Sequence, residues 1–94
     1  LGAGFNVLLC PGHAPGQLAF MVQLPQTGSV LLTSDAISRA AEIDEGFAGS
    51  WDVQQAIHHG ARLIQMAQER DALVIFGHSP EQWPDLRKAP HWFE

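Results

Sequence analysis

Several features that define common protein classes are scarce or absent in this sequence of 94 residues. It has one cysteine, Cys10, so no intramolecular disulfide can form, and we expect a cytoplasmic protein. Only five residues are Lys or Arg and the net charge is −5, so the sequence lacks the basic surface that binds nucleic acid or anionic membranes. No apolar run is as long as a membrane-spanning helix. We therefore expect neither a nucleic-acid nor a membrane partner, and the sequence leaves a homodimer open.

The first ten residues, LGAGFNVLLC, lack an initiator Met and a basic segment, so we do not expect them to be a signal peptide. We expect that Leu1 is not the natural start of the gene product. The composition, 46% hydrophobic and 16% charged, is typical of a folded chain. The length suffices for one small domain and not for two.

Short apolar segments bounded by turn residues predict four β-strands. The first and the last read as buried strands. The strands are expected at Phe5–Cys10, Gln17–Leu24, Ser29–Ser34 and Ala72–Phe76. The second and third lie within hairpin reach, since the intervening PQTG has the residues of a tight turn. Residues 36–49 show no sustained period and predict a loop with one short turn of helix.

The spacing of apolar residues predicts one long helix over Trp51–Arg70. Ser50 or Asp52 can cap its start. Gly60 in its interior costs about 1 kcal/mol relative to Ala, which indicates close packing at that point. The face expected to be buried consists of Val53, Ala56, Ile57, Gly60, Ala61, Ile64 and Ala67.

Three of the predicted strands lead to a residue type that binds metal ions. They lead to His13, Asp35 and His78. Neutral imidazole and carboxylate are the natural ligands of zinc and similar divalent ions, and one Asp can bridge two ions through its two oxygens. Each residue alone has an ordinary explanation: a turn histidine for His13 and His78, and a turn or helix cap for Asp35.

Taken in order, the segments CPGHAPGQ, VLLTSDA and VIFGHS resemble the metallo-β-lactamase superfamily of dimetal hydrolases. The first looks like the superfamily's T-P-G-H-[TS]-P-G-H loop, the second like its strand ending in the bridging Asp, and the third like its last metal-binding strand. The ending GHSPEQWPDLRKAPHWF is similar to the N-acyl homoserine lactonase branch, in which G-H-D-P-x-x-W recurs. The resemblance covers nearly the whole chain.

The resemblance implies an α+β fold in which residues 1–94 form the C-terminal half of one αββα four-layer sandwich. It assigns two divalent metal ions, with zinc first and iron, manganese or cobalt as alternatives. His13 would complete the first metal site, Asp35 would bridge both, and His78 would complete the second. The implied activity of the intact protein is opening of the lactone ring of N-acyl homoserine lactones, and the 94 residues alone are expected to be inactive.

The sequence departs from the family pattern in three places. The other ligands come from an upstream H-x-H-x-D-H motif, which is absent between Leu1 and Glu94, so the chain is either a fragment or a decayed relic. Ser38 stands where the lactonases have a Tyr that contacts substrate, which makes it a weak candidate for that contact. Ser79 replaces an Asp that follows the last His.

Two alternatives to the lactonase interpretation stay open. One is another hydrolase of the same fold, such as a glyoxalase II-like thioesterase, although the acidic balance of the chain disfavours it. The other is a non-catalytic module that keeps the fold and has lost the metals.

Overall fold

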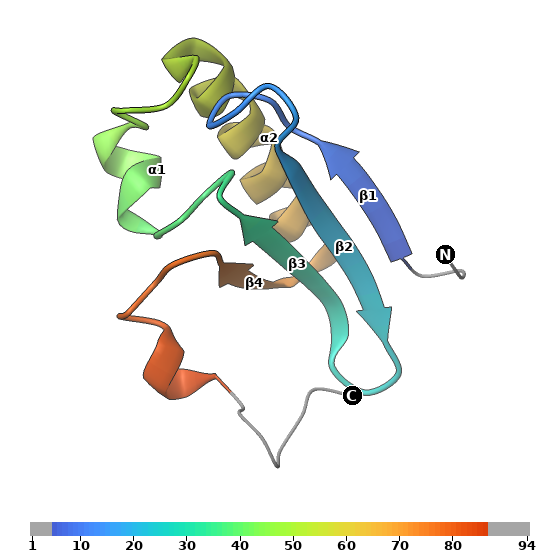
Figure 1. Cartoon of the computed structure of the whole chain (residues 1–94). Coiled ribbons are helices and arrows are strands. Elements are labelled where there is room, and N and C mark those ends of the chain that lie inside the picture. The colour runs from blue at the N-terminus through green and yellow to red at the C-terminus, as the bar shows by residue number, and fades with distance from the viewer. Residues whose placement is uncertain (1–4, 87–94) are drawn as a thin grey trace.

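The computed structural model describes residues 5–86, and its main element is a four-stranded sheet. The strands are β1 (Phe5–Leu9), β2 (Leu18–Leu24), β3 (Gly28–Ser34) and β4 (Leu73–Phe76), in that spatial order. β1, β2 and β3 are antiparallel, whereas β4 runs parallel to β3. The segment between β3 and β4 holds α1 (Ala41–Glu45) and α2 (Val53–Arg70), and the short 3₁₀ helix η1 (Trp83–Asp85) follows β4 (Figure 1).

The predicted elements are confirmed, with bounds within one residue for all four strands and within two residues for the long helix. The tight turn over PQTG joins β2 to β3, and Gly28 at its end has φ of +85°, a conformation that suits glycine. The short helical turn expected within residues 36–49 is α1. The last seven residues of the lactonase-like ending, residues 87–93, lie outside the described residues.

The hydrophobic core lies between the sheet and α2. Met21 and Leu31 are paired in register and have no exposed surface. α2 packs on this core mainly with small residues. Its buried residues are Ala56, Gly60, Leu63 and Ala67. A Cβ on Gly60 would lie 2.8 Å from the ring of Phe47, which confirms the close packing predicted there.

The predicted helix face is partly wrong. Val53 and Ile57 are 38% and 43% exposed and Ala61 is also exposed, whereas Leu63, which was not assigned to the face, is buried. Ile57 follows Ala56 and is therefore turned about 100° away from the line of residues that meets the sheet. The apolar residues of α2 span more of its circumference than this one sheet covers.

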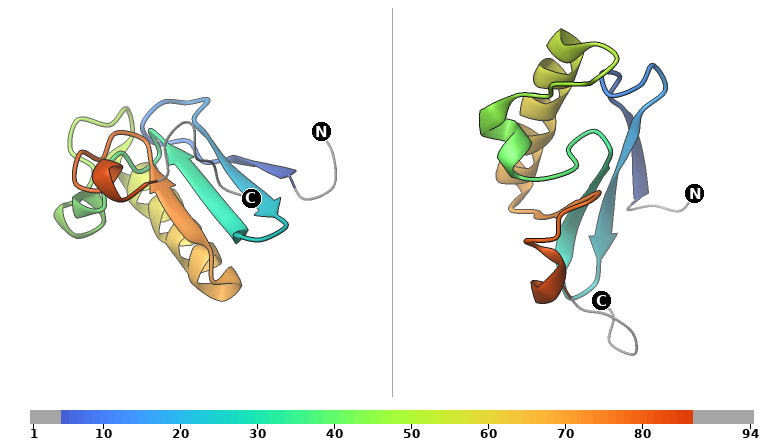
Figure 2. Two further views of the ribbon diagram at one scale, coloured as in Figure 1. Left: turned by 90° about the horizontal axis from the view of Figure 1, so that it is seen from below. Right: turned by 60° about the vertical axis from the view of Figure 1, so that its left-hand side comes forward.

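The opposite face of the sheet is apolar and carries no described helix. Both helices lie on the same side of the sheet (Figure 2). The strand register places eleven apolar side chains on the other side: Phe5, Val7, Leu9, Leu18, Phe20, Val22, Leu24, Val30, Leu32, Leu73 and Ile75. The expectation that β1 is buried is therefore wrong for its outward residues, since Val7 is 46% and Leu9 63% exposed.

Among residues 5–86, no helix combines the length and the apolarity needed to cross a lipid bilayer.

Candidate metal centre

The loop after β1 presents His13 and is fastened at both of its ends. Cys10 donates its backbone N–H to the Gln17 carbonyl at 2.9 Å, which closes the base of the loop. The carbonyl of Gly12 accepts from the Asp52 N–H at 2.8 Å, at the start of α2. A Cβ on Gly12 would lie 2.4 Å from the Cα of Ala56, so the loop backbone rests directly on the helix. The helix start thus fixes the backbone next to His13.

Asp35 follows β3 at a point where the backbone turns sharply. Ser34 has φ of 53°, a region that residues other than glycine rarely adopt and that occurs often at functional sites. The side chain of Thr33 is fully buried, and its hydroxyl donates to the Ile37 carbonyl at 2.7 Å. This bond holds the chain in a tight loop around Asp35.

His78 follows β4, and its backbone is bonded to the loop that carries Asp35. Gly77 and His78 donate their N–H groups to the carbonyls of Ile37 and Ser38 at 3.3 and 2.9 Å. A Cβ on Gly77 would lie only 2.2 Å from the carbonyl oxygen of Ser34. The two loops therefore approach each other more closely than any side chain at position 77 allows.

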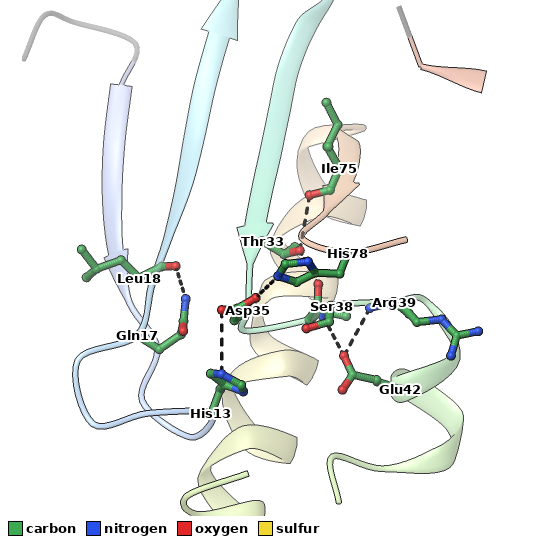
Figure 3. Close-up of polar contacts among 11 residues, drawn as sticks. His13, Gln17, Leu18, Thr33, Asp35, Ser38, Arg39, Glu42, Ile75 and His78 are labelled. Carbon is green, nitrogen blue, oxygen red and sulfur yellow. Dashed lines mark hydrogen bonds and ion pairs between the residues drawn. The ribbon is translucent and has the colours of Figure 1, made fainter. Parts of the chain in front are cut away.

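The three residues predicted as metal ligands come together at this edge of the sheet (Figure 3). His78 Nε2 lies 2.7 Å from Asp35 Oδ1, and His13 Nε2 lies 3.8 Å from Asp35 Oδ2. Each carboxylate oxygen thus faces a different imidazole. The side chains of His13, Asp35 and His78 are 47%, 38% and 73% exposed, so the group is accessible from solvent.

The donor chemistry of this group fits divalent ions, although residues 5–86 contain no set of three His, Cys, Asp or Glu side chains already arranged around one ion. Zinc bonds of about 2.0–2.2 Å allow two ligands of one ion to lie up to about 4 Å apart. The 3.8 Å between His13 and Asp35 is within that limit. The contact between His78 Nε2 and Asp35 Oδ1 is only 2.7 Å, so these two atoms must move apart for an ion to bind between them.

Ser38, the weak candidate for a substrate contact, is held by its backbone. Its N–H donates to Glu42 Oε1 at 2.6 Å, and its carbonyl accepts from the His78 N–H. Glu42 also accepts from the N–H of Arg39 at 3.2 Å. These contacts fix Ser38 at the point where the Asp35 loop meets His78, and its hydroxyl as a substrate contact stays a prediction.

Sequence reasoning missed the side chains that support the site, among them an ion pair between the two loops. Arg39 pairs with Glu81, and this pairing raises the pKa of Arg39 and lowers the pKa of Glu81. Both residues are exposed and far apart in the sequence, so no local pattern marks them. Glu42 lies in the first turn of α1 but four residues after Ser38, one more than in a capping box, so it too lacks a recognised local pattern.

The fold matches solved hydrolases, one of which is a dizinc lactonase. A solved N-acyl homoserine lactone hydrolase with its product N-hexanoyl-L-homoserine at the catalytic metal centre superposes with a TM-score of 0.90 at 30% identity. That match covers 99% of this chain and 38% of the hydrolase. AidC, a dizinc quorum-quenching lactonase, gives 0.72 at 26% identity over 96% of this chain and 32% of its own. The described sheet and helices thus have a metallo-β-lactamase-type fold, as expected, and a hydrolase of the β-lactamase superfamily at 17% identity agrees in fold alone.

The sequence homologues are more specific. The chain is 36% identical over 93 residues to the N-acyl homoserine lactonase AttM of Azorhizobium caulinodans, a match that covers 95% of this chain and 35% of that enzyme. It is 33% identical to the lactonase AiiA of Bacillus thuringiensis subsp. kurstaki, over 95% of this chain and 36% of AiiA. No protein-family model matches the chain. The chain spans about a third of the length of these lactonases. Both relatives are of the lactonase class that the motifs of the sequence resemble.

Proposed function

We propose that the chain is the C-terminal portion of a metallo-β-lactamase-type domain that opens the lactone ring of N-acyl homoserine lactones, a quorum-quenching reaction. The observation that carries the proposal is the convergence of His13, Asp35 and His78 in a chain whose homologues are lactonases. The free thiol of Cys10 is buried, which fits the reducing cytoplasm.

The three side chains have distinct roles in this proposal. His13 and His78 supply neutral nitrogen ligands on opposite sides of Asp35, and each oxygen of Asp35 serves one side. Two divalent ions, zinc in the first instance, would lower the pKa of a water molecule and polarise the ester carbonyl. The remaining ligands would come from an H-x-H-x-D-H motif upstream of Leu1. Ser38, placed by its backbone beside His78, is the candidate to contact the substrate.

The first test is metal analysis and substrate comparison with the gene product that contains this chain. We expect about two equivalents of zinc per chain. We also expect opening of the lactone ring of N-hexanoyl homoserine lactone, which chromatography of the ring-opened product would measure. Less than one equivalent of metal after reconstitution would contradict the proposal and favour a non-catalytic module. Faster hydrolysis of a glutathione thioester than of the lactone would favour the glyoxalase II-like alternative.

The second test addresses Asp35. Asp35→Asn keeps the shape of the side chain but removes the negative charge and one oxygen, so it cannot serve both histidine sides. We expect the loss of at least one metal equivalent and a fall in kcat/KM of about 100-fold or more. Asp44→Asn, an exposed acidic position on α1, is the matched control and should change neither. Full metal content in Asp35→Asn would exclude the bridging role.

A further inference from the structure

The free edge of β4 is closed by a side chain rather than by a strand. β4 is the last strand of the described sheet, so one side of its backbone has no strand partner there. The Nε2 group of Gln82 donates to the Val74 carbonyl at 2.5 Å. The Phe76 N–H donates to Oε1 of the same Gln82 at 3.0 Å. One carboxamide therefore satisfies both an acceptor and a donor on this edge.

The pattern of these two bonds is that of one residue in a parallel strand. Such a residue donates its N–H to one carbonyl of the neighbouring strand and accepts from the N–H two residues further on. Gln82 does the same with Val74 and Phe76, on either side of Ile75. Its carboxamide carries the same donor and acceptor as a peptide group. Gln82 thus occupies the place of a single residue of a fifth strand.

Gln82 is itself held in place on the far side of His78. Its backbone N–H donates to the Ser79 hydroxyl at 3.2 Å. The neighbouring Glu81 pairs with Arg39 on the loop that follows β3. The bond from the Phe76 N–H to Gln82 Oε1 therefore closes residues 76–82 into a loop, and His78 lies within this loop.

We propose that Gln82 is a positioning residue that closes the edge of β4 and fixes the backbone from which His78 reaches Asp35. Gly77 and His78 each donate a backbone hydrogen bond to the Asp35 loop, and these bonds require β4 to end in one fixed conformation. The consequence for metal affinity rests on the proposed function, whereas the effect on the backbone does not.

The test uses the gene product that contains this chain and two variants of Gln82. Gln82→Met keeps the length and volume of the side chain and removes both hydrogen bonds, so it separates hydrogen bonding from packing. Gln82→Glu keeps an acceptor for Phe76 but loses the donor to Val74. The controls are Gln54→Met and Gln54→Glu, at an exposed position of α2.

The first measurement is residue-resolved amide hydrogen exchange of the metal-free protein. In Gln82→Met we expect the protection of the Phe76 amide to fall about tenfold, with a parallel fall at Gly77 and His78. The Gln54 controls should match the parent protein. Unchanged protection at Phe76 would overturn the edge closure, and a loss at Phe76 that leaves Gly77 and His78 protected would overturn the positioning role.

The second measurement is a cobalt titration followed by the absorption of the bound ion. In Gln82→Met we expect one of two equivalents to bind about 10-fold more weakly while the other is unchanged, because only one site would use His78. Equal weakening of both would indicate a general structural defect and contradict the positioning of His78. If the parent protein binds no cobalt, the proposed function fails, and the exchange measurement still decides the role of Gln82.

Discussion

At the scale of single residues, the approach of the loops around Asp35 depends on the absence of a side chain at position 77. Gly77→Ala would place a methyl group against the Ser34 carbonyl, where a Cβ has only 2.2 Å. We expect a loss of about 1–3 kcal/mol in the free energy of unfolding, because the loops must move apart. Denaturant unfolding of the metal-free protein measures this loss. Gly16→Ala is the control, since nothing lies within 4 Å of that position, and equal loss in both variants would contradict the argument.

The residues of the candidate site divide by what a sequence can show. His13, Asp35 and His78 each have an ordinary local explanation and are predicted as ligands only because their three segments, in order, resemble a known family; the structure brings them near one another. Thr33 and Gln82 are not predicted, because their bonds depend on backbone groups exposed by particular loop conformations. A hydroxyl or an amide that bonds to the backbone leaves no periodic signal in the sequence.

At the scale of elements, the N-terminus of α2 links helix stability to the loop of His13. The Asp52 side chain accepts from the Gln55 N–H and side chain, and these bonds lower the pKa of Asp52. A lowered pKa contributes stability above the unfolded value, and this contribution is lost as the pH falls through the folded value. The parent protein should therefore lose more stability between pH 7 and pH 3 than Asp52→Asn, which keeps the cap without titrating. Thermal melting followed by circular dichroism measures the difference, and parallel pH curves would contradict it.

The C-terminus of α2 is less favourable than its N-terminus. Asp71 follows the helix with φ of 51° and ψ of 46°, a left-handed conformation, and it places a negative charge near the negative end of the helix dipole. Asp71→Gly should raise the free energy of unfolding by about 0.5–1 kcal/mol. Asp71→Asn removes only the charge and should give a smaller gain. Chemical denaturation compares the three proteins, and a loss of stability in Asp71→Gly would refute the expectation.

At the scale of the whole molecule, short apolar runs and turn chemistry predict the strands, and the spacing of apolar residues predicts the long helix. What the sequence could not show is which side of each element meets which neighbour. Ile57 is assigned to the core because it is apolar and near the right spacing, yet the residues of α2 that are buried are Ala56, Gly60, Leu63 and Ala67. Likewise, β1 reads as buried because its residues are apolar, and only the fold reveals that Val7 and Leu9 face outward.

The apolar outer face of the sheet leads to a prediction about the chain as a unit. In the proposed sandwich, a second sheet from upstream residues covers this face. Without it, side chains such as Val7 and Leu9 stay in water, and burying each fully is worth about 1.5–3 kcal/mol. Residues 1–94 expressed alone should therefore aggregate or remain molten, with strong binding of a hydrophobic dye and no cooperative thermal transition.

A charge on this face should have opposite effects on the 94-residue chain and on the longer gene product that includes the upstream sheet. Val7→Lys should make the 94-residue chain more soluble and should destabilise the gene product that includes the upstream sheet by about 2 kcal/mol or more, because the lysine would be buried there. Asn6→Lys, whose side chain points to the other face of β1, is the control and should do neither. Size-exclusion chromatography and denaturant unfolding measure the two effects. A sharp melt of the isolated 94-residue monomer would show that no second sheet covers this face. The same would follow if Val7→Lys left the free energy of unfolding of the longer gene product unchanged.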